Sequence, residues 1–533
     1  MAQQGGAAAE GEAGGVLGWI ERTGNRLPDP VFIFFYLIAA LVVVSVLASL
    51  AGYSALHPTQ RDAGGAPVLI AATSLLAPEN IRRLWADMPL TFTGFHPLGY
   101  VLVVMLGAGI AERTGLFASA MRGAVHGAPK ALLTPMVALV AMMGNLAADA
   151  AYVVLVPLAG ILYAAAGRHP VAGIACAFAG VSGAFSANLL PGQLDALLFG
   201  ITEAAAEALV PAWDANIVGN WYFISGMTLV FLPVIWYVTD RVIEPRLGVH
   251  AAADAPPELS VDEQKPLDAA QKKGLARAGI AALAVVLLWA WFLFGPGTPL
   301  LDQAAQGPAR LSPFFKSLVA GFFVLFLACG WVYGVAAGTV NGHRDIVRMM
   351  QESMADLAYY LVLAFAAAHF IAMFAWSNLG LIFAVQGAEL IRASKLPVPA
   401  LLGLIVLLTG AVNLFVGSAS AKWALLAPVL VPMMMLLGVS PEATTAAYRV
   451  GDGATNIITP LMVYFPLILI FAQRWQKDFG LGSLTAMMLP YSLWLLVAGV
   501  LLMIGWVLLD IDLGPGAPVH FSLPASSAQS SFQ

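Results

Sequence analysis

Long runs of apolar residues constrain the fold of this chain more than any other feature of its sequence. A helix needs about 20 mostly apolar residues to cross the hydrocarbon core of a bilayer. Runs of this kind recur from Pro30 to near Leu509, so membrane segments take up nearly the whole chain of 533 residues. Only 10% of the residues are charged, against about 25% in a typical soluble domain. The sequence therefore predicts an all-α polytopic membrane protein without a separate soluble domain.

Two apolar stretches are too long to be single spans, and each has polar residues in its middle. The stretch 130–165 is interrupted at Gly144-Asn145, and the stretch 398–437 is interrupted at Asn413 and at Gly417-Ser418-Ala419-Ser420. Each half has only about 15 residues, short of the ~20 needed to cross. We therefore expect two re-entrant helical hairpins, each of which enters and leaves on one face of the membrane. The other apolar segments then make nine transmembrane helices.

The distribution of lysine and arginine agrees with this topology. With a cytoplasmic N-terminus, sixteen of these residues fall on the cytoplasmic side and seven outside, while Lys422 and Arg449 lie within membrane segments. Cytoplasmic loops carry an excess of basic residues in most membrane proteins, and this excess would shrink if both long stretches crossed. The net charge of −5 is spread thinly and indicates no nucleic-acid partner. The expected partner of the surface is the lipid bilayer, and the C-terminus is expected on the periplasmic side.

One block of the sequence occurs twice. The repeated positions are Asn145, Pro157, Pro170 and Asn188 in the first block and Asn413, Pro428, Pro441 and Asn456 in the second. Each block reads as a hairpin followed by a broken span, 171–200 in the first and 441–472 in the second. The first hairpin is expected to enter from the cytoplasm and the second from outside. This is an inverted repeat, which places a binding site near the middle of the membrane where the halves meet.

Arg449 and Asp452 lie in the apolar stretch from Ala443 to Phe471. Because an arginine at bilayer depth costs about 2.5–3.5 kcal/mol even on lenient insertion scales, this position predicts a site. The two residues are three apart and share one face of a helix, so they either neutralise one another or leave Arg449 to bind an anionic substrate. A guanidinium binds a carboxylate or sulfonyl group with a planar fork that lysine lacks. The two are not exclusive: an arginine that Asp452 holds until substrate arrives would be a coupling device, with Asp452 as the candidate proton carrier.

Two further carboxylates lie in membrane segments. Asp195 has no basic residue within a helical turn in the sequence. An unpaired buried carboxylate suits proton uptake and release, because burial disfavours its charged form. The alternative is a structural carboxylate near the extracellular end of its span. Asp149, in the first hairpin, is either a second proton carrier or a helix cap.

Aromatic and amide side chains lie beside the predicted helix breaks. Ser420 and Trp423 follow the tip of the second hairpin, where a helix N-terminus favours an anion. Trp423 offers a flat apolar wall to an aryl ring, or else anchors its helix at the membrane interface. The repeat-related amides either ligate Na⁺ or hydrogen-bond the broken backbone. These four amides are Asn145, Asn188, Asn413 and Asn456.

Three motifs resemble those of the p-aminobenzoyl-glutamate transporter (AbgT) family. They are SANLLPGQLDALLFGIT (186–202), NLFVGSASAKWALLAPVLVPM (413–433) and AAYRVGDGATNIITP (446–460). The segments 21–38, 92–115 and 167–189 also resemble this family, so the likeness covers nearly the whole chain. It implies a homodimer whose protomer has nine transmembrane helices and two re-entrant hairpins. It also implies transport of p-aminobenzoyl-glutamate or related compounds, with the exporters of sulfonamide antimetabolites as the most similar branch.

The resemblance also assigns site residues. Those expected to bind substrate are Ser420, Trp423, Pro441, Arg449, Asp452 and Pro460, and Asp195 joins Asp452 in coupling. Three positions depart from the family pattern. Lys422 stands where a glutamine is expected, which bears on substrate charge preference. Gly144-Asn145-Leu146 replaces a Ser-Asn-Thr-like hairpin tip, which bears on an ion site made of hydroxyls, and Pro191 is unusual in its segment.

Together these features predict a secondary active transporter of the bacterial inner membrane and not an enzyme. We expect proton-driven export of aryl carboxylates or sulfonamides by alternating access, with no cofactor other than H⁺ or Na⁺ as coupling ion. A Na⁺-coupled importer of p-aminobenzoyl-glutamate is the main alternative. A channel would need rings of like side chains along one path. An intramembrane aspartyl protease would need two facing carboxylates, which Arg449 would disturb.

The chain divides accordingly into seven segments. They are a cytoplasmic N-terminal tail (1–29), scaffold helices with an extracellular loop (30–129), the first half of a transport core (130–217), further scaffold helices (218–397), the second half of the core (398–477), the last helix (478–514) and a C-terminal tail (515–533). The transport core is expected to move relative to the scaffold.

Overall fold

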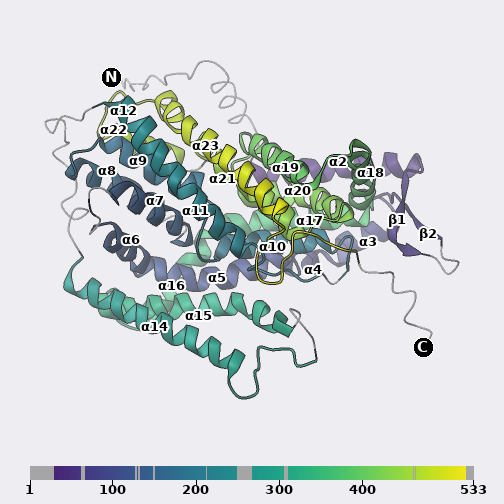
Figure 1. Ribbon diagram of the computed structural model, residues 1–533. Helices are drawn as coiled ribbons and strands as arrows, with labels where there is room; N and C mark the ends of the chain where they lie inside the picture. Colours follow the sequence, from purple (N-terminus) through teal and green to yellow (C-terminus); the bar gives the residue numbers. More distant parts are fainter. Residues whose placement is uncertain are drawn as a thin grey trace, which may run out of the picture.

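The described part of the protein is helical apart from one small sheet. The computed structural model describes residues 29–61, 66–126, 129, 132–147, 151–211, 213–248, 267–304, 310–459, 461–462 and 464–523. The sheet has two antiparallel strands, β1 (Ser54–Arg61) and β2 (Pro67–Ala71), which project from the helices at the right of Figure 1. Asp149, Pro460 and residues 1–28 lie outside the described residues.

Seven of the described helices are long and apolar enough to cross a membrane, or eight if one bent pair forms a single span. The seven are α2 (Pro30–Leu50), α11 (Trp221–Tyr237) with its continuation through η5 (Val238–Ile243) and α12 (Glu244–Leu247), α14 (Ala269–Phe294), α15 (Ser312–Ala337), α17 (Ala358–Trp376), α20 (Ala419–Leu436) and α23 (Leu481–Leu508). The bent pair is α5 (His96–Arg113) and α6 (Leu116–His126). The prediction of a helical multi-pass membrane protein is confirmed, while the count of nine spans stays a prediction.

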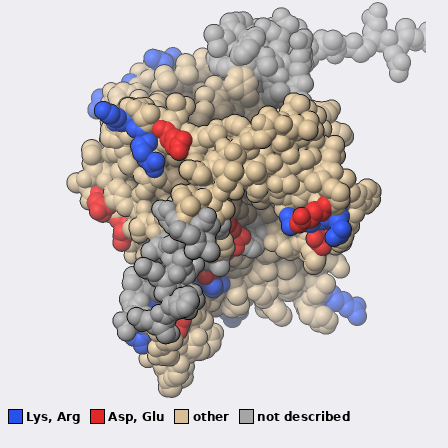
Figure 2. All heavy atoms as spheres, turned by 90° about the vertical axis from the view of Figure 1, so that its right-hand side faces the viewer, with Lys and Arg blue, Asp and Glu red and all other residues tan. Residues whose placement is uncertain are grey.

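The outside of these helices suits a lipid environment. Large apolar side chains are exposed along α14, among them Leu283, Leu287 and Trp291. Figure 2 shows uncharged side chains over most of one face, with charged side chains gathered in a few separate patches. Because soluble monomers rarely expose large contiguous apolar areas, this surface indicates burial in a bilayer or against another protein. Figure 1 shows α14 and α15 side by side along one edge of the molecule, where α15 packs on α5.

The first repeated block contains two short helical arms followed by an interrupted helix, while the re-entrant topology of the two arms stays a prediction. One arm of the hairpin is α7 (Leu133–Met143), which ends in the short 3-10 turn η2 (Gly144–Ala147). The other arm runs through η3 (Ala151–Leu155) into α8 (Val156–Ala165). The broken span begins with α9 (Pro170–Phe178) and the π-turn η4 (Ala179–Gly183), leaves helical geometry, and resumes as α10 (Gln193–Ala206).

The second repeated block has the same order of elements. Its hairpin consists of α19 (Val398–Asn413) and α20, with a non-helical tip between them. Its broken span consists of α21 (Pro441–Thr455) and α22 (Phe465–Gln473). The expectation that every arm is too short to cross is wrong for α20, because its 18 residues meet the length of a spanning helix. This arm is longer than expected because Ser418 caps the helix through the amide of Ala421, so that α20 begins within the polar tip.

Equivalent residues begin and end the helices of the two blocks. Pro170 and Pro441 are the first residues of α9 and α21, a position where proline costs no hydrogen bond. Gly167 and Gly438 precede them with φ of +77° and +83°, in the left-handed region that glycine adopts without steric cost. The repeat seen in the sequence is therefore a repeat of local structure.

The remaining helices lie around the two blocks. They are α3 (Pro78–Ala86), α4 (Met88–Thr93), α16 (His343–Asp356) and α18 (Leu379–Ser394). In the second block α19 packs closely on α21, and α18 packs on α20. The position of α21 among these helices matters most for the site, because every residue from Pro441 to Thr455 is buried.

Close contact between α19 and α21 depends on a glycine. A Cβ atom at Gly451 would lie 2.1 Å from the carbonyl oxygen of Val406 and 2.2 Å from the hydroxyl of Thr409. We therefore expect Gly451→Ala to destabilise the protein by about 1–3 kcal/mol through overpacking. Gly505→Ala is the matched control, because a Cβ atom there meets no atom within 4 Å. Thermal unfolding of both variants in detergent checks this, and equal melting temperatures would contradict it.

Candidate functional site

Arg449 and Asp195 form an ion pair between the two broken spans. Nη1 of Arg449, on α21, lies 2.6 Å from Oδ1 of Asp195, on α10. The relative exposures of the two residues are 1% and 3%. The other carboxylate oxygen, Oδ2, accepts a hydrogen bond of 2.7 Å from the amide of Gly192 at the start of α10. Two sequence interpretations are wrong here, because Asp195 is paired and because Arg449 pairs with Asp195 rather than with Asp452.

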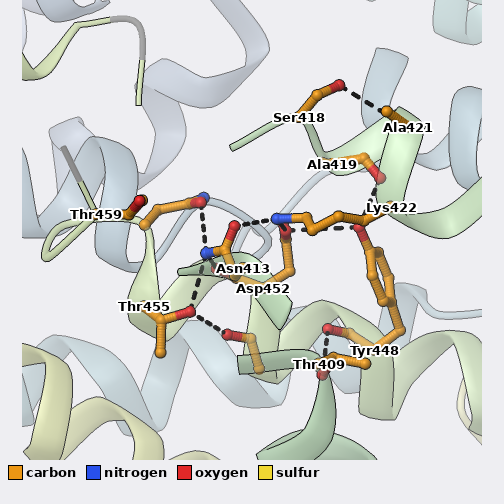
Figure 3. Close-up of polar contacts among 12 residues, drawn as sticks. Thr409, Asn413, Ser418, Ala419, Ala421, Lys422, Tyr448, Asp452, Thr455 and Thr459 are labelled. Carbon is orange, nitrogen blue, oxygen red and sulfur yellow. Dashed lines mark hydrogen bonds and ion pairs between the residues drawn. The ribbon is translucent and has the colours of Figure 1, made fainter. Parts of the chain in front are cut away.

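The partner of Asp452 is Lys422. The ammonium group of Lys422, in the first turn of α20, makes an ion pair with Oδ1 of Asp452 on α21 (Figure 3). It also donates a hydrogen bond to Oδ1 of Asn413 at the end of α19. Lys422 is fully buried. Its charge ties both arms of the second hairpin to α21.

Asn413 joins the second hairpin to the break after α21. Its Nδ2 lies 2.8 Å from the carbonyl oxygen of Asp452, 2.9 Å from the hydroxyl of Thr455 and 2.8 Å from Oδ1 of Asn456. These bonds satisfy polar groups that the end of the helix leaves without partners, which is required inside a membrane. The amide side chains thus serve the hydrogen bonding of the break, and their role as Na⁺ ligands stays a prediction.

The amides of the first block make weaker contacts. Nδ2 of Asn145 lies 3.4 Å from the carbonyl oxygen of Ala184, and Nδ2 of Asn188 lies 3.3 Å from that of Met142. Oδ1 of Asn145 and the hydroxyls of Ser182 and Ser186 are buried without a hydrogen-bond partner among the described residues. The first block therefore offers unused oxygen atoms, whereas those of the second block are engaged.

Trp423 packs inside the protein. Its ring stacks on that of Tyr448 with centroids 4.5 Å apart, and it is fully buried. Its Nε1 donates to the hydroxyl of Thr202 at 2.9 Å, and this hydroxyl lies 2.8 Å from that of Thr445. The indole therefore joins α20 to α21 and α10.

The other residues that the resemblance assigns to substrate lie at helix ends. Pro441 is the first residue of α21 and is buried. The hydroxyl of Ser420 lies 3.2 Å from that of Ser418 at the start of α20. Ser420 also faces a narrow space between α10, α17 and α20. Pro460 lies outside the described residues.

A cavity of about 360 Å³ lies where the hairpin tips and the helix breaks of both blocks meet. Its volume is in the range of small-molecule sites. The first block contributes Asn145, Tyr152, Phe185, Gln193, Leu194 and Leu197, the second contributes Gly417, Ala419, Asn456, Met462 and Tyr464, and Val101, Met105, Leu357 and Tyr360 complete the wall. Leu194 is next to Asp195 in the chain, and Ala419 is three residues before Lys422. The cavity therefore adjoins the segments that carry both buried ion pairs.

Aromatic rings form one wall of this cavity. Tyr152 and Tyr464 stack with centroids 4.3 Å apart and ring planes 12° from parallel, and Tyr360 also lines the space. Sequence reasoning missed these tyrosines and Gln193. The available signal was their position within a few residues of the breaks after Asn145 and Asn456, since residues near such breaks face the midplane site.

Trp423 and Tyr152 are expected to differ in what they contribute. Trp423→Ala should lower stability by about 3–5 kcal/mol, as loss of a buried aromatic side chain does. Tyr152→Ala should cost less, because its ring borders an open space, and should weaken binding of aryl compounds instead. Thermal unfolding and ligand binding measured side by side test this. A stable Trp423→Ala protein that loses only ligand binding would contradict it.

Comparison with known proteins places the chain in a family. Residues 15–521 match the AbgT putative transporter family. The p-aminobenzoyl-glutamate transport protein of Escherichia coli (strain K12) is 35% identical over 506 residues, which cover 95% of this chain and 97% of the relative.

Two solved structures are similar to this one and 40% identical in sequence. The YdaH transporter of Alcanivorax borkumensis, described as having an unusual topology, matches with a TM-score of 0.84 over 92% of this chain and 100% of its own. MtrF of Neisseria gonorrhoeae, described with a class of antimetabolite efflux pumps, matches with a TM-score of 0.88 over 94% and 100%. This agreement in sequence and fold shows that the chain belongs to the AbgT transporter family.

Proposed function

We propose that this transporter exports aryl carboxylates or sulfonamides by alternating access, driven by protons. The observation that carries the proposal is the cavity between the two blocks, beside a buried arginine and two buried carboxylates. Broken helices that meet around a midplane cavity are typical of secondary transporters. The similarity to a p-aminobenzoyl-glutamate transport protein and to an antimetabolite efflux pump supports this substrate class.

The cavity has the chemistry that an aryl-glutamate or sulfonamide needs. Tyr152, Tyr360 and Tyr464 offer flat apolar faces to an aromatic ring. The amides of Asn145 and Gln193 offer donors and acceptors to the polar groups of the substrate. Such a wall, mostly apolar with a few polar groups, is typical of small-molecule sites.

Arg449 is the anchor that we propose for the substrate anion. Its Nη1 is engaged with Asp195, but its Nε is buried without a hydrogen-bond partner among the described residues. A buried donor without an acceptor costs about 1–3 kcal/mol, so an arriving carboxylate or sulfonyl oxygen would be favoured. Substrate binding would then compete with Asp195 for the guanidinium. For export driven by protons, Asp195 would bind its proton only after the substrate has left and release it before the next substrate binds, so that proton and substrate move in opposite directions.

Direction and coupling ion distinguish this proposal from a Na⁺-driven importer. Asp195 and Asp452 each pair with a basic residue instead of facing one another, which argues against an aspartyl protease dyad. Na⁺ remains the alternative ion, because the buried oxygens of Asn145, Ser182 and Ser186 have no hydrogen-bond partner in the part of the chain that the structure describes.

We also propose a division into moving and fixed parts. The segments 130–217 and 398–477 form the transport core, and 30–129 with 218–397 form a scaffold. Exposed apolar side chains on α14 support contact with lipid or with a second copy in a homodimer. We place this assembly in a bacterial inner membrane with the N-terminus in the cytoplasm.

Removal of the guanidinium is expected to weaken substrate binding. Arg449→Ala should reduce affinity for p-aminobenzoyl-glutamate or a sulfonamide about 10- to 100-fold, because hydrogen bonds to charged groups contribute about 1.5–3 kcal/mol. Arg168→Ala is the matched control, since Arg168 also forms ion pairs, with Asp240 and Glu244, but away from the cavity. Calorimetry on purified protein compares them. Unchanged affinity in a folded Arg449→Ala protein would remove Arg449 from the substrate site.

Neutral replacements of the carboxylates are expected to uncouple transport from pH. In proteoliposomes, Asp195→Asn and Asp452→Asn should transport radiolabelled substrate without acceleration by an imposed proton gradient. Asp345, partly exposed in the first turn of α16 and paired with Arg348, supplies the control Asp345→Asn, which should keep this acceleration. Flux that follows a Na⁺ gradient, with unchanged pH dependence in both variants, would favour the Na⁺-coupled alternative.

A further inference from the structure

The Lys422 ammonium lies among oxygen atoms that would otherwise suit a small monovalent cation. The ammonium donates a hydrogen bond to Oδ1 of Asn413 and pairs with Oδ1 of Asp452, and these two residues lie on different helices (Figure 3). All three residues are buried, so bulk solvent does not share this position. The ammonium group reaches these oxygen atoms at the end of a four-carbon side chain that starts from the first turn of α20.

The surroundings favour a cation for three reasons. Asp452 supplies a full negative charge, and Asn413 supplies an uncharged amide oxygen. Asn413 is also the last residue of α19, where the dipole of a helix places partial negative charge. In secondary transporters, carbonyls at such half-helix ends coordinate Na⁺. A carboxylate, an amide oxygen and a helix C-terminus together are the ligands that a hard monovalent cation uses.

The first block has a matching contact between its hairpin asparagine and the carbonyl group at its helix break, but it lacks the lysine. Nδ2 of Asn145 approaches the carbonyl oxygen of Ala184 as Nδ2 of Asn413 approaches that of Asp452. Ala184 precedes Asn188 by four residues, as Asp452 precedes Asn456, so alanine takes the place of the aspartate. No lysine or arginine occurs between Gly144 and Pro157. The second block thus has a lysine in its hairpin together with an aspartate at this position, which indicates that the two act as a pair.

We propose that Lys422 is a built-in cation that replaces Na⁺ in the second block. The fixed ammonium neutralises Asp452 and holds α19, α20 and α21 together, which a bound Na⁺ would otherwise do. The second block therefore needs no Na⁺ at any stage of the cycle. This rests on the proposed function only in assuming that the two blocks form a transport core. It follows that removal of the ammonium leaves Asp452 and Asn413 as a vacant Na⁺ site.

The test is Na⁺-dependent stabilisation of purified protein, which needs no transported substrate. Wild type should show the same melting temperature in NaCl and in choline chloride. Lys422→Ala should be less stable than wild type in choline chloride. It should gain about 1–3 °C in apparent Tm in roughly 0.1 M NaCl, since a ligand that binds only the folded state stabilises it. If Lys422→Ala does not fold in choline, Lys422→Gln, which keeps most of the side-chain length, takes its place.

Three controls separate the proposed site from general salt effects. Lys422→Arg keeps the charge and should not respond to Na⁺. The double variant Lys422→Ala/Asp452→Asn lacks the carboxylate and should lose the response. Lys316→Ala removes a lysine from an exposed ion pair, 2.9 Å from Asp214, and should behave as wild type.

Two outcomes would overturn the proposal. One is Na⁺-dependent stabilisation of wild type as large as that of Lys422→Ala. The other is a folded Lys422→Ala or Lys422→Gln protein whose Tm is the same in both salts. Absence of aryl-glutamate transport would refute the proposed substrate class but would leave this result standing, because the readout is cation binding alone.

Discussion

The structure depends on the pairing of charges inside an apolar protein. Removing one partner of a buried ion pair typically costs about 3–5 kcal/mol, because the other charge stays buried and uncompensated. Here two such pairs, Arg449 with Asp195 and Lys422 with Asp452, both involve α21. One pair joins α21 to the first block and the other joins it to the second hairpin. The helix that carries Arg449 and Asp452 is therefore also the one that connects the two halves.

The cavity follows from the way in which broken helices satisfy their backbone. Non-helical backbone at membrane depth is tolerated only inside protein or beside a polar space. Asn413 meets this requirement at the break after α21, and Asn145 does so less completely at the first hairpin. Both breaks and both hairpin tips meet in one region. Polar groups at these positions therefore line one shared cavity. The same constraint that permits the breaks thus creates the site.

The two halves repeat the same elements but differ in charge. Proline and glycine occupy equivalent helix ends in both, whereas Lys422 and Asp452 have no counterparts in the first. The helices of the second half are consequently held together by the ion pair of Lys422 with Asp452 and by the stacking of Trp423 on Tyr448. The first half contributes Tyr152 to the wall of the cavity and has buried oxygens without a hydrogen-bond partner among the residues that the structure describes. The two halves therefore differ in charge and in packing, although their elements follow the same order.

The sequence by itself determined the membrane class, the two interrupted hairpins, the broken spans and the identity of the charged residues, because hydropathy and helix breaks are local properties of the chain. Only the tertiary structure decided which charges pair. Asp195 and Arg449 are 254 residues apart, so no helical spacing relates them. It also decided that Trp423 packs inward while Tyr152 and Tyr464 border the cavity. Side-chain direction depends on how helices from distant segments pack, and a local pattern does not contain that information.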